Sequence, residues 1–246
     1  MSAMGRENAC KVYEQISAMG WAGDGIRPGG LELTSRALAC CGFSPSSRIL
    51  DVGCGAGATL DQLTRVHEFT AIGIDSSSAL LDQGRTAYPC LQFVRASGEN
   101  LPFADRWADG VLAECVLSII RDTGRAVDEF RRVLKIGGRL ILSDVYVRDR
   151  AGADQLSDMP VDCCLRGAVA REELVDTLTR RGFEIDLWED HSDALTRFAV
   201  KLVLSCGSMK GFWLRTGPES MDPDTIQRAI SRAKPGYFLL IAHRSQ

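Results

Sequence analysis

The residues best placed to do chemistry lie in the segment RILDVGCGAGATL. An apolar run there ends at Asp51, and three glycines follow at alternate positions, Gly53, Gly55 and Gly57, with Cys54 between the first two. Glycine permits a tight turn and lets a ligand approach the backbone closely. The spacing therefore predicts a cofactor-binding loop between a buried strand and a helix.

Further polar residues follow the next apolar runs. Asp75 ends one run, and a carboxylate at that place can accept hydrogen bonds from both hydroxyls of a ribose. Ser76 comes next, where we expect it to cap the following helix and to border the same site. Glu114 and Cys115 end a later run. Because ligands of α/β sheets bind beyond the carboxyl ends of strands, we expect this pair near the cofactor as well.

Two cofactors suit such a loop. The string GCGAGA satisfies the dinucleotide fingerprint G-x-G-x-x-G/A, which keeps an NAD-dependent oxidoreductase open as an alternative. The acid two residues before the first glycine distinguishes between the two cofactors, because the pattern D-x-G-x-G-x-G resembles that of the class I S-adenosylmethionine-dependent methyltransferases. That resemblance implies that the loop holds the methionine part of the cofactor and that Asp51 orients its amino group.

Two further segments, RASGENLPFADRWADG and EFRRVLKIGGRLILSDV, resemble the same family. The resemblance covers roughly residues 45–147 and is greatest to the ubiquinone/menaquinone-biosynthesis and arsenite methyltransferase branch. It implies S-adenosylmethionine as cofactor and places Ser97 and Gly98 against the adenine. Methyl transfer from a sulfonium is an in-line displacement, in which the protein mainly aligns donor and acceptor and excludes water. We expect a small-molecule acceptor; a non-catalytic module that only binds the cofactor is a third possibility.

Cysteines raise a second hypothesis about the acceptor. The chain has nine, an odd number, with no C-x-x-C pair, so we expect free thiols and no metal site. The segment DCCLRGAVAREELVDTLTRRGFEI resembles arsenite methyltransferases, which implies that Cys164 binds a thiophilic acceptor. In this alternative Cys10, Cys163 or Cys206 would complete a set of three sulfurs.

The elements that position these residues follow from the hydrophobic pattern. Strands alternate with helices, and several strands are almost wholly apolar, which predicts a parallel sheet covered on both faces. The family resemblance refines this to an α/β, Rossmann-like, doubly wound, mostly parallel seven-stranded sheet in which the terminal strand YFLLIAHR is antiparallel. An amphipathic helix is expected from Thr123 to Leu134, with Gly137 and Gly138 ending it.

Length and composition bound the rest. The chain has 246 residues with a net charge of −3, and 45% of its residues are hydrophobic. These values favour one globular domain over residues 1–246 and give no basic field for nucleic acid and no span for membrane insertion. We expect a helical lid over 1–44, a cofactor-binding core over 45–149, and a C-terminal half with an acceptor-side insertion over 150–246. With no signal peptide evident, the expected compartment is the cytoplasm.

Overall fold

A seven-stranded sheet organises the chain. The computed structural model describes residues 10–18, 27–218 and 222–246, and within them the strand order is β4-β3-β2-β5-β6-β9-β8. Strands β2 to β6 run parallel, whereas β9 runs antiparallel to both of its neighbours, β6 and β8. The bounds are β2 Arg48–Val52, β3 Thr70–Asp75, β4 Gln92–Arg95, β5 Ala108–Glu114, β6 Leu134–Val147, β8 Phe183–Asp190 and β9 Pro235–Arg244. The predicted Rossmann-like sheet with an antiparallel strand is confirmed.

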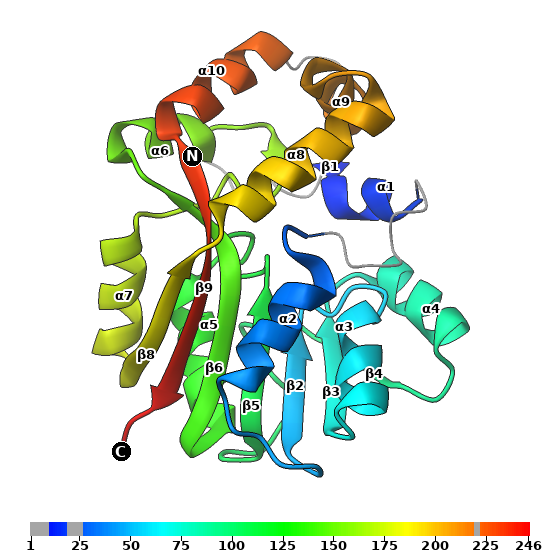
Figure 1. Cartoon of the computed structure of the whole chain (residues 1–246), viewed down its shortest axis with the longest axis vertical. Coiled ribbons are helices and arrows are strands. Elements are labelled where there is room, and N and C mark those ends of the chain that lie inside the picture. Colours follow the sequence, from blue (N-terminus) through cyan, green and yellow to red (C-terminus); the bar gives the residue numbers. More distant parts are fainter. Residues whose placement is uncertain (1–9, 19–26, 219–221) are drawn as a thin grey trace.

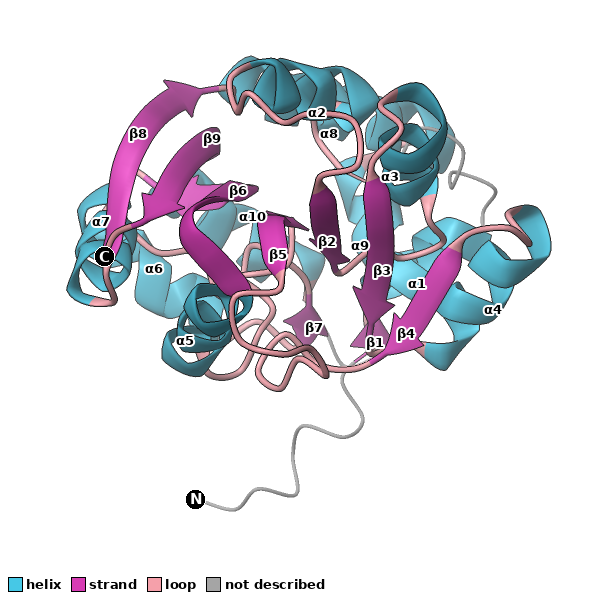
Figure 2. Ribbon diagram, turned by 90° about the horizontal axis from the view of Figure 1, so that it is seen from below, coloured by secondary structure: helices cyan, strands magenta, loops and turns pink. Residues whose placement is uncertain are grey.

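Helices cover both faces of this sheet (Figure 2). On one face lie α2 (Gly30–Ala39), α3 (Ala58–Asp61) and the π-helical turn η3 (Gln62–Val66); on the other lie α5 (Thr123–Val133) and α7 (Arg171–Arg180). Helix α4 (Ser78–Ala87) packs beside β3 and β4, at the β4 edge.

The two faces are apolar because the sheet is buried on both sides. Neighbouring residues of β2 point in opposite directions, so Ile49 belongs to the same buried cluster as Leu33 of α2, and Leu50 belongs to the other cluster, with Phe130 of α5. All four side chains are buried. At about 25 cal/mol per Å² of apolar area, these two packed layers supply most of the driving force for folding.

A second group of elements lies beyond the carboxyl ends of the parallel strands (Figure 1). Two short strands, β1 (Cys10–Lys11) and β7 (Val161–Asp162), pair there in parallel. The helices of this group are α1 Val12–Ala18, α6 Arg150–Ser157, α8 Ser192–Cys206, α9 Met209–Thr216 and α10 Pro223–Ala233. The division into a lid, a core and an acceptor-side insertion stays a prediction.

Two local predictions were wrong. Helix α5 ends at Val133, because Leu134 is already extended and pairs with Ala108 of β5. The pair Gly137–Gly138 therefore lies inside β6, where the register with β5 shifts between Ala108 and Gly110, and does not end the helix.

The cap of α4 is also displaced by one residue from the prediction. Ser77 holds the capping position, with its hydroxyl accepting a hydrogen bond from the Leu80 backbone N–H at 3.3 Å. Ser76 lies one residue too early for this contact, although its carbonyl accepts a hydrogen bond from Arg95.

None of the helices in the described part of the chain combines the length and the apolarity needed to cross a membrane. The cytoplasmic compartment stays a prediction.

Candidate functional site

A cavity of about 430 Å³ opens at the carboxyl ends of β2, β3 and β5. This volume lies in the range of about 300–1,000 Å³ usual for small-molecule sites. Its wall contains every residue predicted to bind the cofactor except Gly57: Asp51, Gly53, Cys54, Gly55, Asp75, Ser76, Ser97, Gly98, Glu114 and Cys115. Gly57 is instead the N-cap of α3, directly before its first residue, Ala58.

The glycine loop is tied to the end of the neighbouring strand. The backbone N–H groups of Gly53 and Cys54 donate to the carbonyl of Ile74 at 2.7 and 3.1 Å. Gly53 has a left-handed backbone with φ of 77°, and a Cβ there would lie 2.0 Å from a methyl of Val116. Only glycine fits at this position. At Gly55, with φ of 54°, a Cβ would meet nothing within 4 Å, so the open side of the loop faces the cavity.

Asp75 fixes this loop as well as facing the cavity. One of its carboxylate oxygens accepts a hydrogen bond from the Gly55 N–H at 2.9 Å, and the other accepts one from the Ser77 N–H at 2.8 Å. Each oxygen keeps a further lone pair for a ligand. The sequence predicted the position of this acid but not its contact with the loop.

Asp51 is buried with an unsatisfied oxygen. The residue is 2% exposed, and its Oδ2 has no hydrogen-bond partner among the described residues. Burial, together with the nearby Glu114 and Asp75 carboxylates, raises the pKa of Asp51 to about 8 against the opposing effect of Arg27. A cation placed at Oδ2 would both satisfy the oxygen and favour the ionised acid.

Glu114 is the centre of a buried polar network. Its carboxylate lies 2.8 Å from the guanidinium of Arg27, and the hydroxyls of Thr34 and Thr59 donate to it at 2.8 and 3.1 Å. The Arg27 side chain is 7% exposed, and its Nε has no partner among the described residues. Arg27 also lines the cavity.

Sequence reasoning missed Arg27. It lies in the Gly/Pro-rich stretch just before α2, far along the chain from the glycine loop, and no motif marks it. The available signal was a single cationic residue between glycines and a proline, directly before a helix, which could have marked Arg27 as a candidate for the site.

The adenine-side residues Ser97 and Gly98 lie in one turn. The Ser97 hydroxyl donates to the Glu99 carboxylate at 3.0 Å and accepts from the Glu99 N–H at 3.2 Å. A Cβ at Gly98 would lie 3.0 Å from Ile120. The hydroxyl is thus engaged within its own turn, while the backbone at Gly98 borders the cavity.

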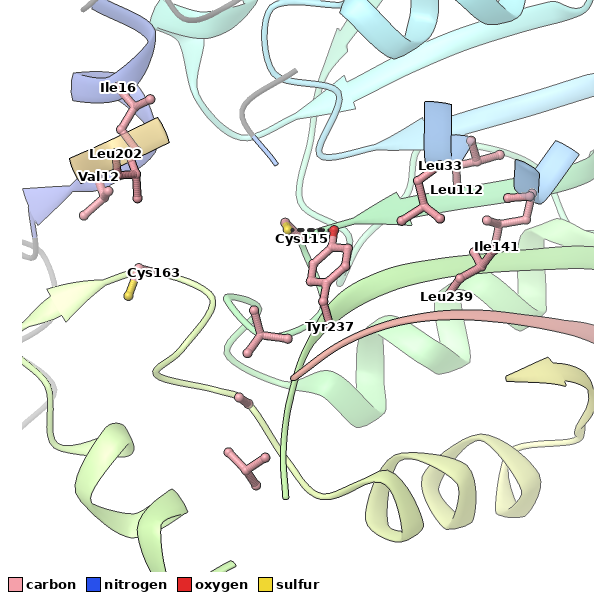
Figure 3. Close-up of a cluster of buried hydrophobic side chains, with 14 of the residues drawn as sticks. Val12, Ile16, Leu33, Leu112, Cys115, Ile141, Cys163, Leu202, Tyr237 and Leu239 are labelled. Carbon is pink, nitrogen blue, oxygen red and sulfur yellow. Dashed lines mark hydrogen bonds between the residues drawn. The ribbon is translucent and has the colours of Figure 1, made fainter. Parts of the chain in front are cut away.

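Among the side chains that the structure describes, Cys164 does not form a group of three with Cys163 and Cys206. Among the residues that the structure describes, the group of three ligand-type side chains within 4.8 Å of one another is Cys115, Asp144 and Cys164. Cys206 ends α8 and packs in the apolar core, and Cys163 points away from this group, beside β7 (Figure 3). The side chain of Cys10 lies outside the described part of the chain. The described neighbour of Cys164 in such a group is Cys115, which directly follows β5 and which no local spacing could show, while the part of the prediction that involves Cys10 stays a prediction.

Two tyrosines border this cysteine pair. The Tyr237 hydroxyl lies 3.2 Å from the Cys115 thiol (Figure 3), and the backbone N–H of Cys164 donates to the Tyr13 hydroxyl at 3.1 Å. Burial, followed by the neighbouring thiols, raises the pKa of Tyr13 well above its usual value. Tyr13 also lines the cavity, next to Cys115.

Comparison with known proteins agrees with this site. Residues 50–142 match the family model described as a methyltransferase domain. The O-methyltransferase resE of Aspergillus sclerotiorum is 32% identical over 86% of this chain and 81% of its own length. The ubiquinone/menaquinone biosynthesis C-methyltransferase UbiE of Vibrio cholerae is 29% identical over 54% of this chain and 55% of its own.

A solved structure gives the same fold. The [4+2]-cyclase SpnF superposes with a TM-score of 0.67 at 25% identity, covering 87% of this chain and 80% of that one. The relatives compared here support S-adenosylmethionine in place of NAD, and neither they nor the sulfur positions support the arsenite alternative. On its glycine loop, its sheet and these relatives, the chain belongs to the class I S-adenosylmethionine-dependent methyltransferases.

Proposed function

We propose that the chain transfers a methyl group to a hydroxyl oxygen of a small organic acceptor, with S-adenosylmethionine held by the cavity residues. One observation carries the cofactor assignment: two buried polar atoms, Oδ2 of the Asp51 acid and Nε of the Arg27 cation, lack hydrogen-bond partners among the described residues, and both residues line one cavity. The amino-acid end of S-adenosylmethionine supplies an ammonium and a carboxylate, one for each. NAD carries no such pair, so the arrangement favours the methyl donor.

The rest of the cavity suits the nucleoside part. Asp75 has lone pairs free for the two ribose hydroxyls, and its hydrogen bonds to Gly55 and Ser77 orient them. The side chains of Ile119 and Ile120 line the cavity near Gly98 and offer an apolar surface for a purine ring. Since the Ser97 hydroxyl is already engaged, we assign the polar adenine contact to the backbone at Gly98.

The bound cofactor supplies a methyl group already activated by the positive sulfonium. The protein residues then hold the two reactants in line and exclude water. Tyr13 and Cys115 form the wall from which the acceptor would approach. Tyr13 remains a neutral phenol, because its pKa is raised by burial, so it can donate a hydrogen bond to the acceptor but cannot serve as its base. The acceptor hydroxyl gives its proton to bulk solvent outside the water-free reaction centre.

The hydroxyl acceptor is supported by the resE relative, which is named as an O-methyltransferase. The test compares one aromatic scaffold carrying a hydroxyl, an amine or only a ring carbon, incubated with isotopically labelled S-adenosylmethionine. We expect label in the hydroxyl compound and none in its pre-formed methyl ether, which is the matched control. Label in the amine or carbon compound alone would contradict oxygen as the acceptor atom.

Cofactor binding is measured separately by calorimetry with S-adenosylhomocysteine and with NAD. We expect saturable binding of the first only. Binding without any methyl transfer across the panel would instead place the chain with a protein such as the SpnF cyclase, whose structure it resembles. Equal binding of NAD would overturn the cofactor assignment.

A further inference from the structure

Three side chains from separate parts of the chain meet beside the cofactor cavity. Cys115 follows β5, Asp144 lies in β6, and Cys164 lies just after β7. Their two sulfurs and a carboxylate oxygen lie within 4.8 Å of one another. Cys115 and Asp144 are buried, and Cys164 is half-buried. No other such group of three occurs among the side chains that the structure describes.

The spacing is close to that of a filled metal site. Zinc binds thiolate sulfur at about 2.3 Å and carboxylate oxygen at about 2.0–2.2 Å in a tetrahedron, which puts its ligand atoms roughly 3.5–3.8 Å apart. The three ligand atoms lie within 4.8 Å of one another, so they would have to approach by only about 1 Å to reach the spacing of a filled site. Rotation of a thiol about its side-chain bonds supplies a movement of that size.

Each of the three residues has an outer partner that orients it. The Ser118 N–H and hydroxyl donate to the two oxygens of Asp144 at 3.0 and 2.7 Å. The Tyr237 hydroxyl lies 3.2 Å from the Cys115 sulfur, and the Cys164 N–H donates to Tyr13. Metal ligands are held in this way by a second layer of hydrogen bonds, and loss of an outer partner costs about 10–100-fold in affinity.

A purely structural explanation accounts for Asp144 but not for the thiols. Both carboxylate oxygens of Asp144 accept hydrogen bonds from Ser118, so the buried carboxylate has its hydrogen-bond partners there. Nothing in that contact requires two cysteines to converge on it. Cys115 also keeps a side chain at a left-handed φ of 56°, where glycine would be free of strain. Strained residues of this kind collect at functional sites.

We propose that Cys115, Asp144 and Cys164 bind a thiophilic divalent cation of the zinc class. Binding would displace the two thiol protons to solvent and form two metal–sulfur bonds and one metal–oxygen bond. Three protein ligands leave a fourth position for water or for an atom of a bound molecule. The cation would tie the segment after β7 to the ends of β5 and β6. Because Cys115 also lines the cavity, the cation would border the site proposed for the acceptor, but its binding can be measured without methyl transfer.

The test uses the whole chain, reduced and treated with a chelator, then titrated with Co²⁺ as a spectroscopic stand-in for Zn²⁺. We expect one equivalent to bind with a sulfur-to-cobalt charge-transfer band, and Zn²⁺ to abolish the band by competition. Cys115→Ser and Cys164→Ser should each remove about half of its intensity, one of two thiolates. Cys163→Ser, a buried neighbour outside the group, is the matched control and should keep the full band.

A second readout needs no variant. Zn²⁺ should slow alkylation of the half-buried Cys164 of the natural chain, as mapped by mass spectrometry, while the exposed Cys40 and Cys90 continue to react. Absence of a charge-transfer band in the natural chain, or equal bands in Cys163→Ser and Cys164→Ser, would overturn the site. So would unchanged alkylation of Cys164 at saturating Zn²⁺. Circular dichroism of each metal-free variant checks that a lost band does not reflect unfolding.

Discussion

The guanidinium of Arg27 lies 2.8 Å from the carboxylate of Glu114, with both side chains less than a tenth exposed. Removing the cation with Arg27→Met leaves a buried charge unpaired, so we expect the free energy of unfolding to fall by about 3–5 kcal/mol. Arg36→Met is the control: it breaks the exposed pair with Glu189 and should cost less than about 1 kcal/mol. Urea denaturation measures both.

The double variant Arg27→Met with Glu114→Gln separates stability from binding. It removes both charges, so most of the lost stability should return, because no unpaired charge remains. Affinity for the cofactor should stay low in the double variant, because the carboxylate of S-adenosylmethionine still lacks Arg27 as its partner. Equal costs for Arg27→Met and Arg36→Met would show that the buried pair does not matter for folding.

The glycine loop offers a second test. Gly55 and Gly42 both have a left-handed backbone with no atom within 4 Å of an added Cβ, but of the two only Gly55 lines the cavity. Leucine at either position should cost about 1–2 kcal/mol of stability through backbone strain. Calorimetry should find S-adenosylhomocysteine binding lost in Gly55→Leu and kept in Gly42→Leu. Similar affinities in the two variants would move the cofactor away from the loop.

Asp75 is expected to bind the ribose. Asp75→Asn keeps the shape but removes the charge, so affinity for S-adenosylhomocysteine should fall by on the order of 10–100-fold, the loss of a charged hydrogen bond. An analogue lacking one ribose hydroxyl reports the contact directly. It should bind the natural chain more weakly than the parent compound does, and the difference should shrink in the variant. An undiminished difference would assign the ribose to another residue.

Asp51 predicts a pH dependence. Its pKa in the folded chain is about 8, raised by burial and by Glu114 and Asp75 against the effect of Arg27, whereas an unfolded Asp titrates near about 3.9. Between these values the folded chain holds a proton that the unfolded chain has lost. Stability of the cofactor-free protein should therefore fall as pH rises from about 4 to about 8, and Asp51→Asn should lack this component.

The same residue should release a proton on binding. At pH below about 8 the cofactor ammonium favours the ionised acid, so binding drives the Asp51 proton into the buffer. Calorimetry in two buffers of different ionisation enthalpy counts that proton. The natural chain should release it and Asp51→Asn should not; equal proton counts would contradict the raised pKa.

The sequence predicts those parts of the site that are formed by residues close to one another along the chain. Asp51 and the loop glycines are local to one strand–turn–helix unit, and the structure places all but Gly57 on the cavity wall. Likewise the alternation of apolar strands and helices predicted a parallel sheet, whereas the seven strands and the antiparallel terminal strand were implied by the family resemblance.

Contacts between distant segments could not be predicted in this way. Arg27 reaches Glu114 from a different part of the chain, and Cys164 meets Cys115, which was not among the partners predicted for it. Both depend on which elements lie side by side in space. Boundaries failed for a related reason, because pairing of Leu134 with Ala108 overrides the helix that its sequence favours.

The order in which the strands are made has a consequence for synthesis. The edge strand β8 is bonded to β9 alone, and β9 also closes the outer side of β6. On the ribosome β8 therefore emerges before the strand that pairs with it, leaving two hydrogen-bonding edges open. Such edges attract other chains, so the nascent protein passes through a stage that is prone to aggregation and suited to chaperone capture. That stage lasts until β9 inserts between β6 and β8, which also brings Tyr237 to Cys115.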